Sequence, residues 1–486
     1  MALRIFNTMT GQKAGFQPLV AGKVGLYVCG PTVQDRSHVG HARVYTAFDV
    51  VVRWLRQSGL EVTHVRNFTD VYDKIIRKAA EKGITPHELA EQNIALFWKE
   101  MDELGIARPD VAPKVTEHIP EIVGLIEKLV AKGAAYESKG DVYFSVKNYP
   151  PYGKLSHRNI DDLVAGARVE PGDQKREPLD FALWKAAKPG EPSWDSPWGK
   201  GRPGWHIECS AMSAKYLGET FDLHAGGKDL VFPHHENEIA QSEAASGKTF
   251  CNAWMHNGFV TLDQEKMSKS LGNFFTLRDV LDRFSAEGVR TFLLGTHYRN
   301  PIDFSDAALA QIERRVDYFY ETLARLDERL SIGKDPGPGP IGEAERIDAI
   351  WNNLSESMDD DFNTAGALAA AQDGFALANE LLDGKSKVSD KAQVRRALQK
   401  LREQLKRAGD VLGLWQRPAA AYMLERRDVR AKEKGIDKAV VEAGIAERNE
   451  ARKAKDFARA DAVREKLKAM GVEIMDTAAG TTWKVI

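Results

Sequence analysis

Apolar and polar residues alternate with a different period in different parts of the chain. In the first seventy residues, short apolar runs at 24–29 and 61–69 predict buried strands, and the spacing over about 38–59 predicts a helix between them. A further helical pattern ends at Gly83, with Asp70 expected as its N-cap. This β-α-β-α order is typical of a parallel sheet covered by helices.

The α/β pattern is interrupted over residues 116–200. This segment contains Pro-Pro and Pro-Gly dipeptides and three tryptophans, and it predicts irregular segments rather than more sheet and helix. We therefore expect residues 1–115 and 201–265 to form two halves of one α/β domain. Residues 116–200 would be a connective insertion, and 266–308 a linking region.

A helical period takes over beyond the linking region. From Leu309 to Leu330 the apolar residues step by three and four, which predicts a helix with one buried face. The Gly- and Pro-rich segment 333–340 is a linker, and two or three helices follow up to about Gly413. We therefore expect residues 309–420 to form a helical bundle.

The last segment, residues 421–486, is the most charged part of the chain. Residues 421–470 contain 14 Lys and Arg against 10 Asp and Glu, a local charge of +4. We expect a cation-rich helix over 448–461 and an exposed aromatic side chain at Trp483, a combination suited to RNA backbone contact and base stacking. The alternative is a solvated helix of alternating charge.

Composition limits the classes of protein that this chain can be. Of its 486 residues, 43% are hydrophobic and 28% charged, and 68 Lys and Arg nearly balance 70 Asp and Glu. A wholesale polycation is excluded, whereas a local basic surface is not. The N-terminus lacks the apolar core of a signal peptide, and no uncharged apolar stretch reaches the ~18–20 residues that span a bilayer. Because its three cysteines are far apart and exclude a disulfide framework, we expect a cytoplasmic protein with no membrane partner.

The loop after the first strand ends in a histidine motif, Ser37-His38-Val39-Gly40-His41. Two histidines three residues apart at a helix start point the same way, and Gly40 lets a ligand approach the backbone. Imidazole groups and the positive end of a helix suit a nucleotide phosphate. The alternative is a pair of ordinary surface histidines near a helix cap.

A second motif, Lys266-Met-Ser-Lys269-Ser270, places two lysines among small polar residues. Such a loop can bring positive charge onto a polyphosphate, and the alternative is a solvated charged turn. This pentapeptide is expected by chance in roughly one chain of this length in several thousand. Because it follows the histidine motif some 225 residues downstream, the pair predicts a nucleotide site.

A third candidate site lies at Pro233-His-His-Glu-Asn-Glu238, which is expected to open a helix. His234 and Glu238 are four residues apart and share a face. Thiolate, imidazole and carboxylate groups together suit Zn²⁺. Spacing alone leaves two other possibilities, a capped polar helix and a satisfied histidine pair. It also leaves the remaining ligands open among His235 and the cysteines Cys29, Cys209 and Cys251.

Taken together, the histidine and lysine motifs resemble the two signatures of the class I aminoacyl-tRNA synthetases. Four further segments are similar to the cysteinyl-tRNA synthetases in particular, and the resemblance covers most of the chain: Val28–Val33, Arg66–Lys74, Gly204–Ala211 and Asp222–Glu238. Two residues depart from the family pattern. Val39 replaces the usual Ile or Leu, and Tyr72 stands where a second acidic residue is expected.

The resemblance implies a fold of the α/β class. A Rossmann-like parallel-sheet catalytic domain with an insertion would be followed by a helical bundle and a small mixed domain, 421–486, that binds the anticodon. The implied activity joins L-cysteine to ATP with Mg²⁺ and then to the 3′ end of tRNA(Cys). One Zn²⁺ would bind the substrate thiol and reject serine, so that no editing domain is required. We expect a monomer.

The resemblance also implies a role for individual residues. The zinc ligands would be Cys29, Cys209, His234 and Glu238. The groups that bind the amino and carboxyl groups of cysteine would be Gly30, Thr32, Thr69, Trp205 and His224. For the last two, the alternatives are core packing and a structural hydrogen bond.

Nucleotide contacts follow from the same resemblance. The adenosine would lie against Gly226, Gly227 and Asp229, and the phosphates against His38, Gly40 and His41. Lys269, helped by Lys266, would face the departing pyrophosphate. Cys251 matches nothing in the pattern and is expected to be an inert buried thiol.

Three other functions compete with this interpretation. A cysteine ligase of the mycothiol pathway shares the zinc site and both signatures, but it would lack residues 421–486. A zinc hydrolase would need the His-Glu-x-x-His spacing, which is missing at 234–238. A non-catalytic RNA-binding paralogue would have no use for two intact signatures.

Overall fold

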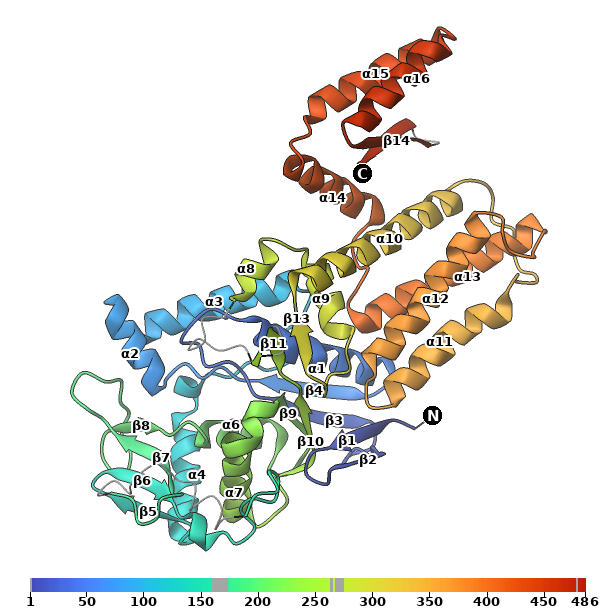
Figure 1. The fold of residues 1–486 in the computed structure, drawn as a ribbon. Helices are drawn as coiled ribbons and strands as arrows, with labels where there is room; N and C mark the ends of the chain where they lie inside the picture. The colour runs from blue at the N-terminus through green and yellow to red at the C-terminus, as the bar shows by residue number, and fades with distance from the viewer. Residues whose placement is uncertain (1, 160–173, 263–264, 267–274, 478–479) are drawn as a thin grey trace.

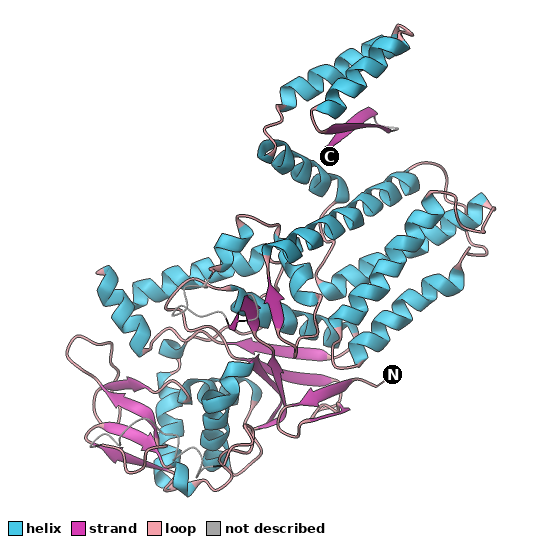
Figure 2. Cartoon of the chain, in the orientation of Figure 1, coloured by secondary structure: helices cyan, strands magenta, loops and turns pink. Residues whose placement is uncertain are grey.

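A computed structural model describes residues 2–159, 174–262, 265–266, 275–477 and 480–486. Its centre is a four-stranded sheet in the order β10-β9-β3-β4 (Figures 1 and 2). The strands are β3 (Lys23–Val28), β4 (Glu61–Arg66), β9 (Phe221–Gly227) and β10 (Cys251–Asn257). Every neighbouring pair is parallel, which confirms the predicted α/β fold class.

Three helices lie between or after strands β3 and β4. Helix α1 (Val39–Gln57) crosses from β3 to β4, and α2 (Asp73–Lys82) and α3 (Pro86–Glu103) come after β4. Gly83 ends α2 in the left-handed conformation at φ 67°, as predicted.

The predicted cap of α2 is wrong. Tyr72 is the N-cap residue, and the Asp70 carboxylate accepts hydrogen bonds from the backbone N and the hydroxyl of Thr116, at 3.1 and 2.6 Å. Asp70 therefore holds the start of the insertion against the segment that follows β4. The residues next to Asp70 in sequence do not predict this contact.

The insertion is more regular than predicted. It contains a helix, α4 (Ile119–Ala131), and three strands of an antiparallel sheet in the order β5-β6-β7-β8, whose fourth strand lies just beyond residue 200. These strands are short, and the middle ones are buried on both faces. They therefore lack the alternation of apolar and polar residues that would have predicted them from sequence. They are β5 (Ala135–Ser138), β6 (Asp141–Phe144), β7 (Phe181–Ala186) and β8 (Gly201–Pro203), and single 3₁₀ turns occur at Val115–Glu117 and Val146–Asn148.

The second half of the parallel sheet is covered by α6 (Ile207–Leu217) and α7 (Glu236–Ser246). Between β9 and α7 the chain passes through a 3₁₀ turn, Lys228–Leu230, and an irregular turn, Val231–His235, in which Phe232 is extended. The helix expected to open at Pro233 therefore begins at Glu236.

Smaller elements complete the α/β region. The N-terminal strands β1 (Arg4–Asn7) and β2 (Gln12–Gly15) form a hairpin. A three-stranded sheet in the order β12-β11-β13 joins the end of the second α/β half to the linking region, which also contains two short helices. These elements are β11 (Val260–Leu262), β12 (Glu265–Lys266), α8 (Leu277–Leu281), α9 (Ala286–Leu294) and β13 (Ile302–Phe304).

A bundle of long helices follows, in which the predicted helix over 309–330 and three further helices up to residue 412 are present. Helix α10 (Asp306–Ser331) leads through the Gly- and Pro-rich segment into α11 (Ala344–Asp359), α12 (Thr364–Leu382) and α13 (Lys391–Leu412). In Figure 1 these helices run side by side beyond the edge of the parallel sheet.

The C-terminal unit has a small core of its own. Trp483 belongs to that core with 3% of its surface exposed, its indole N–H donates to Glu442 at 2.8 Å, and Arg427 covers the ring. The prediction of an exposed stacking surface at Trp483 is therefore wrong. The elements of this unit are α14 (Ala419–Glu433), α15 (Lys438–Lys453), α16 (Phe457–Ala469), β14 (Val472–Thr477) and β15 (Gly480–Val485).

The single helix expected over 448–461 is also wrong. Helix α15 ends at Lys453, Lys455 adopts a left-handed φ of 61°, and the Asp456 side chain caps α16 by accepting from the backbone N of Arg459.

The parallel sheet separates two apolar cores. Leu26 and Val28 face α1, α9 and the bundle, whereas Tyr27 between them faces the insertion with α6 and α7. Among the described residues, no helix is both long and apolar enough to cross a membrane.

Asp361 ties three of these regions together. It lies fully buried in the turn between α11 and α12, and its carboxylate accepts from the backbone N of Phe6 and the hydroxyl of Tyr298, both at 2.9 Å. It also pairs with Arg299 at 2.6 Å. One carboxylate thus joins the N-terminal hairpin, the linking region and the bundle.

Replacing Asp361 by Ala should lower the free energy of unfolding by about 3 kcal/mol, because buried donors and a cation lose their partner. Urea unfolding followed by circular dichroism measures the effect. Asp383→Ala, which removes an exposed partner of Arg325, serves as the control and should leave the midpoint unchanged. Equal midpoints for the two variants would contradict the structural role of Asp361.

Candidate active site and metal centre

A cavity of about 440 Å³ opens at the carboxyl ends of the parallel strands. This edge is where open α/β sheets bind ligands, because the loops that follow neighbouring strands converge there. The structure brings most of the predicted site residues to its wall: Cys29, Gly30, Thr32, His38, Gly40, His41, Thr69, Trp205, Cys209, Gly227, Asp229 and His234.

Some predicted residues lie elsewhere. His224, Gly226 and Glu238 are buried behind the cavity and do not line it. Lys266 lies in β12, and Lys269 lies outside the described residues.

Sequence reasoning missed another part of the wall. It includes Tyr45, Asn67 and the segment 257–260 that follows β10. The last segment could have been found, because it comes directly after a buried parallel strand, as residues 29–32 do.

The histidine motif forms the start of α1. His38 is the N-cap residue, its backbone N donates to His41 Nδ1 at 3.2 Å, and the two rings stack with centroids 3.8 Å apart. A Cβ on Gly40 would lie 2.8 Å from the His38 ring, so Gly40 makes room for this stacked pair as well as for a ligand. Both imidazoles face the cavity beside the positive end of the helix.

The two flanks of the lysine motif lie next to this pair. On one side, β12 pairs with β11, in which Val260 lines the cavity. On the other side, Thr276 forms a β-bridge with His38, and Leu277 N donates to Ser37 O at 2.8 Å. The described residues on either side of the lysine motif, in β12 and at 276–277, therefore lie near the rim that holds the histidine motif.

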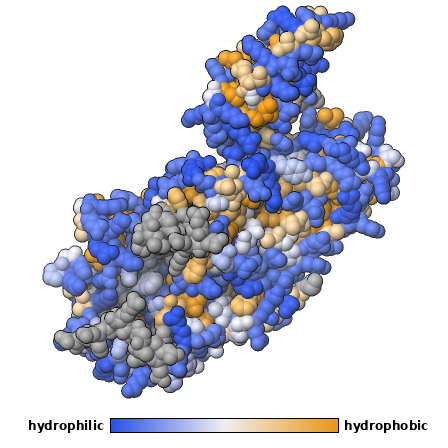
Figure 3. All heavy atoms as spheres, in the orientation of Figure 1, coloured by the Kyte–Doolittle hydropathy of each residue, from blue (hydrophilic) through white to orange (hydrophobic). Residues whose placement is uncertain are grey.

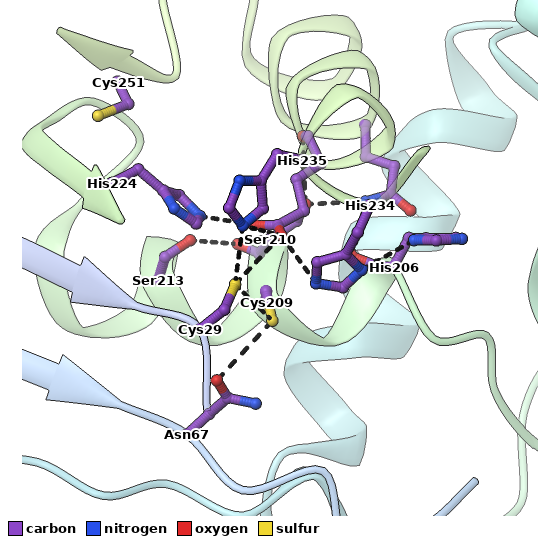
Figure 4. A network of polar contacts seen from close by, with 12 residues as sticks. Cys29, Asn67, His206, Cys209, Ser210, Ser213, His224, His234, His235 and Cys251 are labelled. Atoms are coloured by element: carbon purple, nitrogen blue, oxygen red, sulfur yellow. Dashed lines mark hydrogen bonds and ion pairs between the residues drawn. The ribbon is translucent and has the colours of Figure 1, made fainter. Parts of the chain in front are cut away.

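The floor of the cavity is a buried cluster of metal-ligating side chains (Figure 4). Cys29 Sγ lies 3.9 Å from Cys209 Sγ and 3.5 Å from Glu238 Oε1, and His234 Nε2 lies 3.0 Å from the same Oε1. The donor atoms of these four residues all fall within 4.8 Å of one another. They come from the end of β3, from α6, from the turn before α7 and from α7 itself.

All four cluster residues have strongly shifted pKa values, and that of His234 is raised to about 10: burial alone would lower it, but Glu238 and Cys209 outweigh burial. The hydrogen bond from Cys29 lowers the pKa of Cys209 to about 6, whereas burial raises the pKa of Cys29. Burial would raise the pKa of Glu238, but His224 and His234 hold it well below its usual value. A buried carboxylate beside a readily ionised thiol favours a bound cation, and two sulfurs with imidazole and carboxylate are a donor set typical of Zn²⁺.

A second set of donors overlaps the first. It shares Cys29 and Glu238 and replaces the other two members by His224 and His235. His235 Nε2 lies 3.3 Å from Cys29 Sγ, and His224 Nε2 lies 2.8 Å from Glu238 Oε2. Of the second set only Cys29 lines the cavity, whereas Cys29, Cys209 and His234 of the first set do. The first set is therefore better placed to offer a metal to a ligand held there.

The side chains around the cluster hold its members in place. His206 is hydrogen-bonded to His234 through the two Nδ1 atoms at 2.9 Å, which leaves His234 Nε2 directed at Glu238 (Figure 4). Trp205 stacks on His234 with centroids 4.4 Å apart and lines the cavity. Cys251 is buried and belongs to neither set of donors.

Close backbone contacts fix several of the residues predicted to bind the amino and carboxyl groups of a substrate. Gly30 N donates to Asn67 Oδ1 at 2.9 Å, and a Cβ on Gly30 would lie 1.5 Å from the Asn67 carbonyl oxygen. Thr32 and Thr69 form a β-bridge, and the Thr69 hydroxyl donates to buried Glu208 at 2.7 Å. A small, polar and rigid recess therefore adjoins the metal-ligating cluster.

Comparison with solved structures places this fold among known proteins. Methionyl-tRNA synthetase of Mycobacterium tuberculosis in complex with methionyl-adenylate matches with a TM-score of 0.61 at 18% identity, covering 80% of this chain and 92% of that one. A ternary complex of Agrobacterium radiobacter LeuRS with tRNA matches with a TM-score of 0.58 at 14% identity, covering 83% and 87%. The fold is that of the class I aminoacyl-tRNA synthetases.

Sequence comparison is more specific. The family described as "tRNA synthetases class I (C) catalytic domain" matches residues 15–314, the DALR domain matches 353–416, and the "Cysteinyl-tRNA ligase anticodon binding domain" matches 438–483. Cysteine–tRNA ligases of Anaeromyxobacter sp. Fw109-5 and Geobacter sulfurreducens are 57% and 52% identical, each over 100% of both chains. The chain belongs to the cysteine–tRNA ligase family.

Proposed function

We propose that this protein activates L-cysteine with ATP and Mg²⁺, releases pyrophosphate, and transfers cysteine from the adenylate to the 3′ end of tRNA(Cys). The observation that carries the proposal is one cavity with a thiophilic donor set at its floor and the stacked histidine pair at its rim. A thiol-bearing substrate and a polyphosphate can meet in such a cavity.

In this proposal the protein acts by positioning and electrostatics. The cysteine carboxylate attacks the α-phosphate in line, while His38, His41 and the N-terminal end of α1 stabilise the charge that grows on the phosphates. Lys266 and Lys269 would face the departing pyrophosphate. Gly227 and Asp229 would hold the adenosine, with Gly226 behind them in β9.

The recess beside the cluster would hold the cysteine backbone. Gly30, Thr32, Thr69 and Trp205 all reach the cavity, so they are placed to contact its amino and carboxyl groups. His224 does not reach the cavity, and we propose instead that it orients Glu238 through their 2.8 Å contact.

Selectivity for cysteine over serine would come from the cluster. Cys29, Cys209, His234 and Glu238 would hold Zn²⁺. When bound, this borderline-soft ion supplies a site that prefers a thiolate sulfur to a hydroxyl oxygen. A pocket that sensed size alone would separate these near-isosteres poorly.

Amino-acid-dependent exchange of pyrophosphate into ATP tests the proposal. Cysteine should support exchange at least ~10³-fold better than serine, because rejection rests on lost metal coordination rather than on size. Removing the metal with a chelator should abolish exchange, and adding Zn²⁺ should restore it.

The same assay has outcomes that would contradict the proposal. No exchange with cysteine by folded, zinc-loaded protein would overturn the enzymatic function and favour an RNA-binding paralogue. Exchange followed by transfer to an amino sugar but not to tRNA would favour the mycothiol-pathway ligase, although the match at residues 438–483 speaks against it.

The C-terminal unit offers a surface for RNA. Apolar residues gather on it in Figure 3, and Phe457 is its most exposed large apolar side chain, at 63%. Phe457 begins α16 directly after exposed Lys453 and Lys455. We propose that Phe457, rather than buried Trp483, stacks on a tRNA base beside these cations.

Phe457→Ala should lower kcat/KM for tRNA(Cys) by about tenfold, since one base–aromatic stack is lost. Phe457→Trp should restore it, and cysteine-dependent exchange should stay at the wild-type rate. The matched control is Leu424→Ala, another exposed apolar side chain of this unit, which should change neither reaction. An equal loss in both alanine variants would contradict a specific role for Phe457.

A further inference from the structure

Arg43 lies on α1 only two residues after the histidine motif, with 2% of its surface exposed. Its guanidinium donates to four backbone carbonyl oxygens. Nη2 reaches Thr296 O at 3.1 Å, His297 O at 2.8 Å and Asn300 O at 3.4 Å, and Nη1 donates to Leu293 O. Arg43 thus binds both the end of α9 and the loop that leads from α9 to β13.

A guanidinium suits this place because of its charge and because of its several donors. The last carbonyls of a helix have no partner within the helix, and a cation at that end is stabilised by the helix dipole. Burial lowers the pKa of Arg43 to about 10, so the side chain stays charged at neutral pH. Lysine, with a single nitrogen, cannot reproduce the fork of donors.

The loop that Arg43 holds supports one wall of the cavity from behind. Gly258 N donates to Tyr298 O at 2.8 Å, and Ile302 N donates to Phe259 O at 2.9 Å. A Cβ on Gly258 would lie 2.4 Å from the Asn300 carbonyl, so wall and loop are in backbone contact. Residues 257–260 line the cavity along this contact.

The same support extends to the lysine motif. Strand β13 continues from the loop and pairs in parallel with β11, and β11 pairs with β12, whose last residue is Lys266. One buried side chain therefore connects the helix of the histidine motif to the strands that carry the start of the lysine motif.

We propose that Arg43 is a positioning residue, which fixes the wall at 257–260 and strand β12 relative to His38 and His41. The proposal rests on the function proposed above, because it assigns both motifs to ATP. It predicts an effect on the nucleotide half of the site alone, since the cysteine recess is built on the ends of β3 and β4 and on α6 and α7.

The test compares Arg43→Lys and Arg43→Met with a matched control, Arg395→Met. Arg395 lies on α13 and donates to four carbonyls at the end of α10, those of Arg329, Leu330, Ile332 and Gly333, far along the bundle. Arg43→Lys should lower kcat/KM for ATP in pyrophosphate exchange at least tenfold. KM for cysteine should change less than twofold, with zinc content unchanged. The control variant Arg395→Met should have wild-type kcat/KM for ATP, KM for cysteine and zinc content.

Hydrogen exchange gives a readout that needs no activity. The amides of Gly258 and Ile302 should exchange faster in both Arg43 variants, whereas those of β9 should not. Wild-type kinetics and wild-type protection in Arg43→Lys would overturn the proposal, as would an equal loss in Arg395→Met. The two proposals can fail independently. The absence of pyrophosphate exchange into ATP by the wild-type protein would overturn the proposed function. Unchanged amide protection of Gly258 and Ile302 in the Arg43 variants would overturn the role of Arg43.

Discussion

The rest of the site depends on the burial of one carboxylate among two thiols. Glu238 has no exposed surface, and it keeps its charge because His224 and His234 hold its pKa down. Taking such a group out of water is costly unless a cation compensates it. Cys29 and Cys209 add two sulfur donors beside it: the two Sγ atoms lie 3.9 Å apart, and Cys29 Sγ lies 3.5 Å from Glu238 Oε1. A metal ion bound here would therefore stabilise the junction of β3, α6 and α7 as well as serve a substrate.

The fold places the stacked histidine pair, which we propose binds the nucleotide, at the rim of the same cavity. The first strand of the parallel sheet delivers Cys29 to the floor of the cavity and, a few residues later, the histidine pair to its rim. The linking region returns to the same rim at Thr276, which forms a β-bridge with His38. Adenylation and thiol selection are thus proposed to occur in one cavity. The metal would then coordinate the sulfur of the same cysteine molecule whose carboxylate reacts with ATP. The bundle and the C-terminal unit extend away from the parallel sheet (Figure 1).

Much of this could be predicted from sequence, and the failures have physical causes. The parallel sheet and bundle follow from local periodicity, and the two motifs lie on short segments whose role does not need tertiary context. Asp70 was assigned as a cap because its competing partner, Thr116, is distant in sequence. Trp483 was expected to be exposed but is buried, because its burial depends on which face of the β14–β15 hairpin meets α15 and not on the residues nearby in sequence. Arg43 gave no signal at all, since its partners are backbone carbonyls that any sequence possesses.

Zinc X-ray absorption spectroscopy tests the central claim most directly, because it counts the sulfur atoms bound to the metal. The cluster that lines the cavity contains Cys29 and Cys209, whereas the overlapping set with His224 and His235 contains Cys29 alone. Our account predicts two sulfur ligands per zinc in the free protein, three after L-cysteine is added, and two still after L-serine is added. A single sulfur ligand, or a count that L-cysteine leaves unchanged, would contradict it.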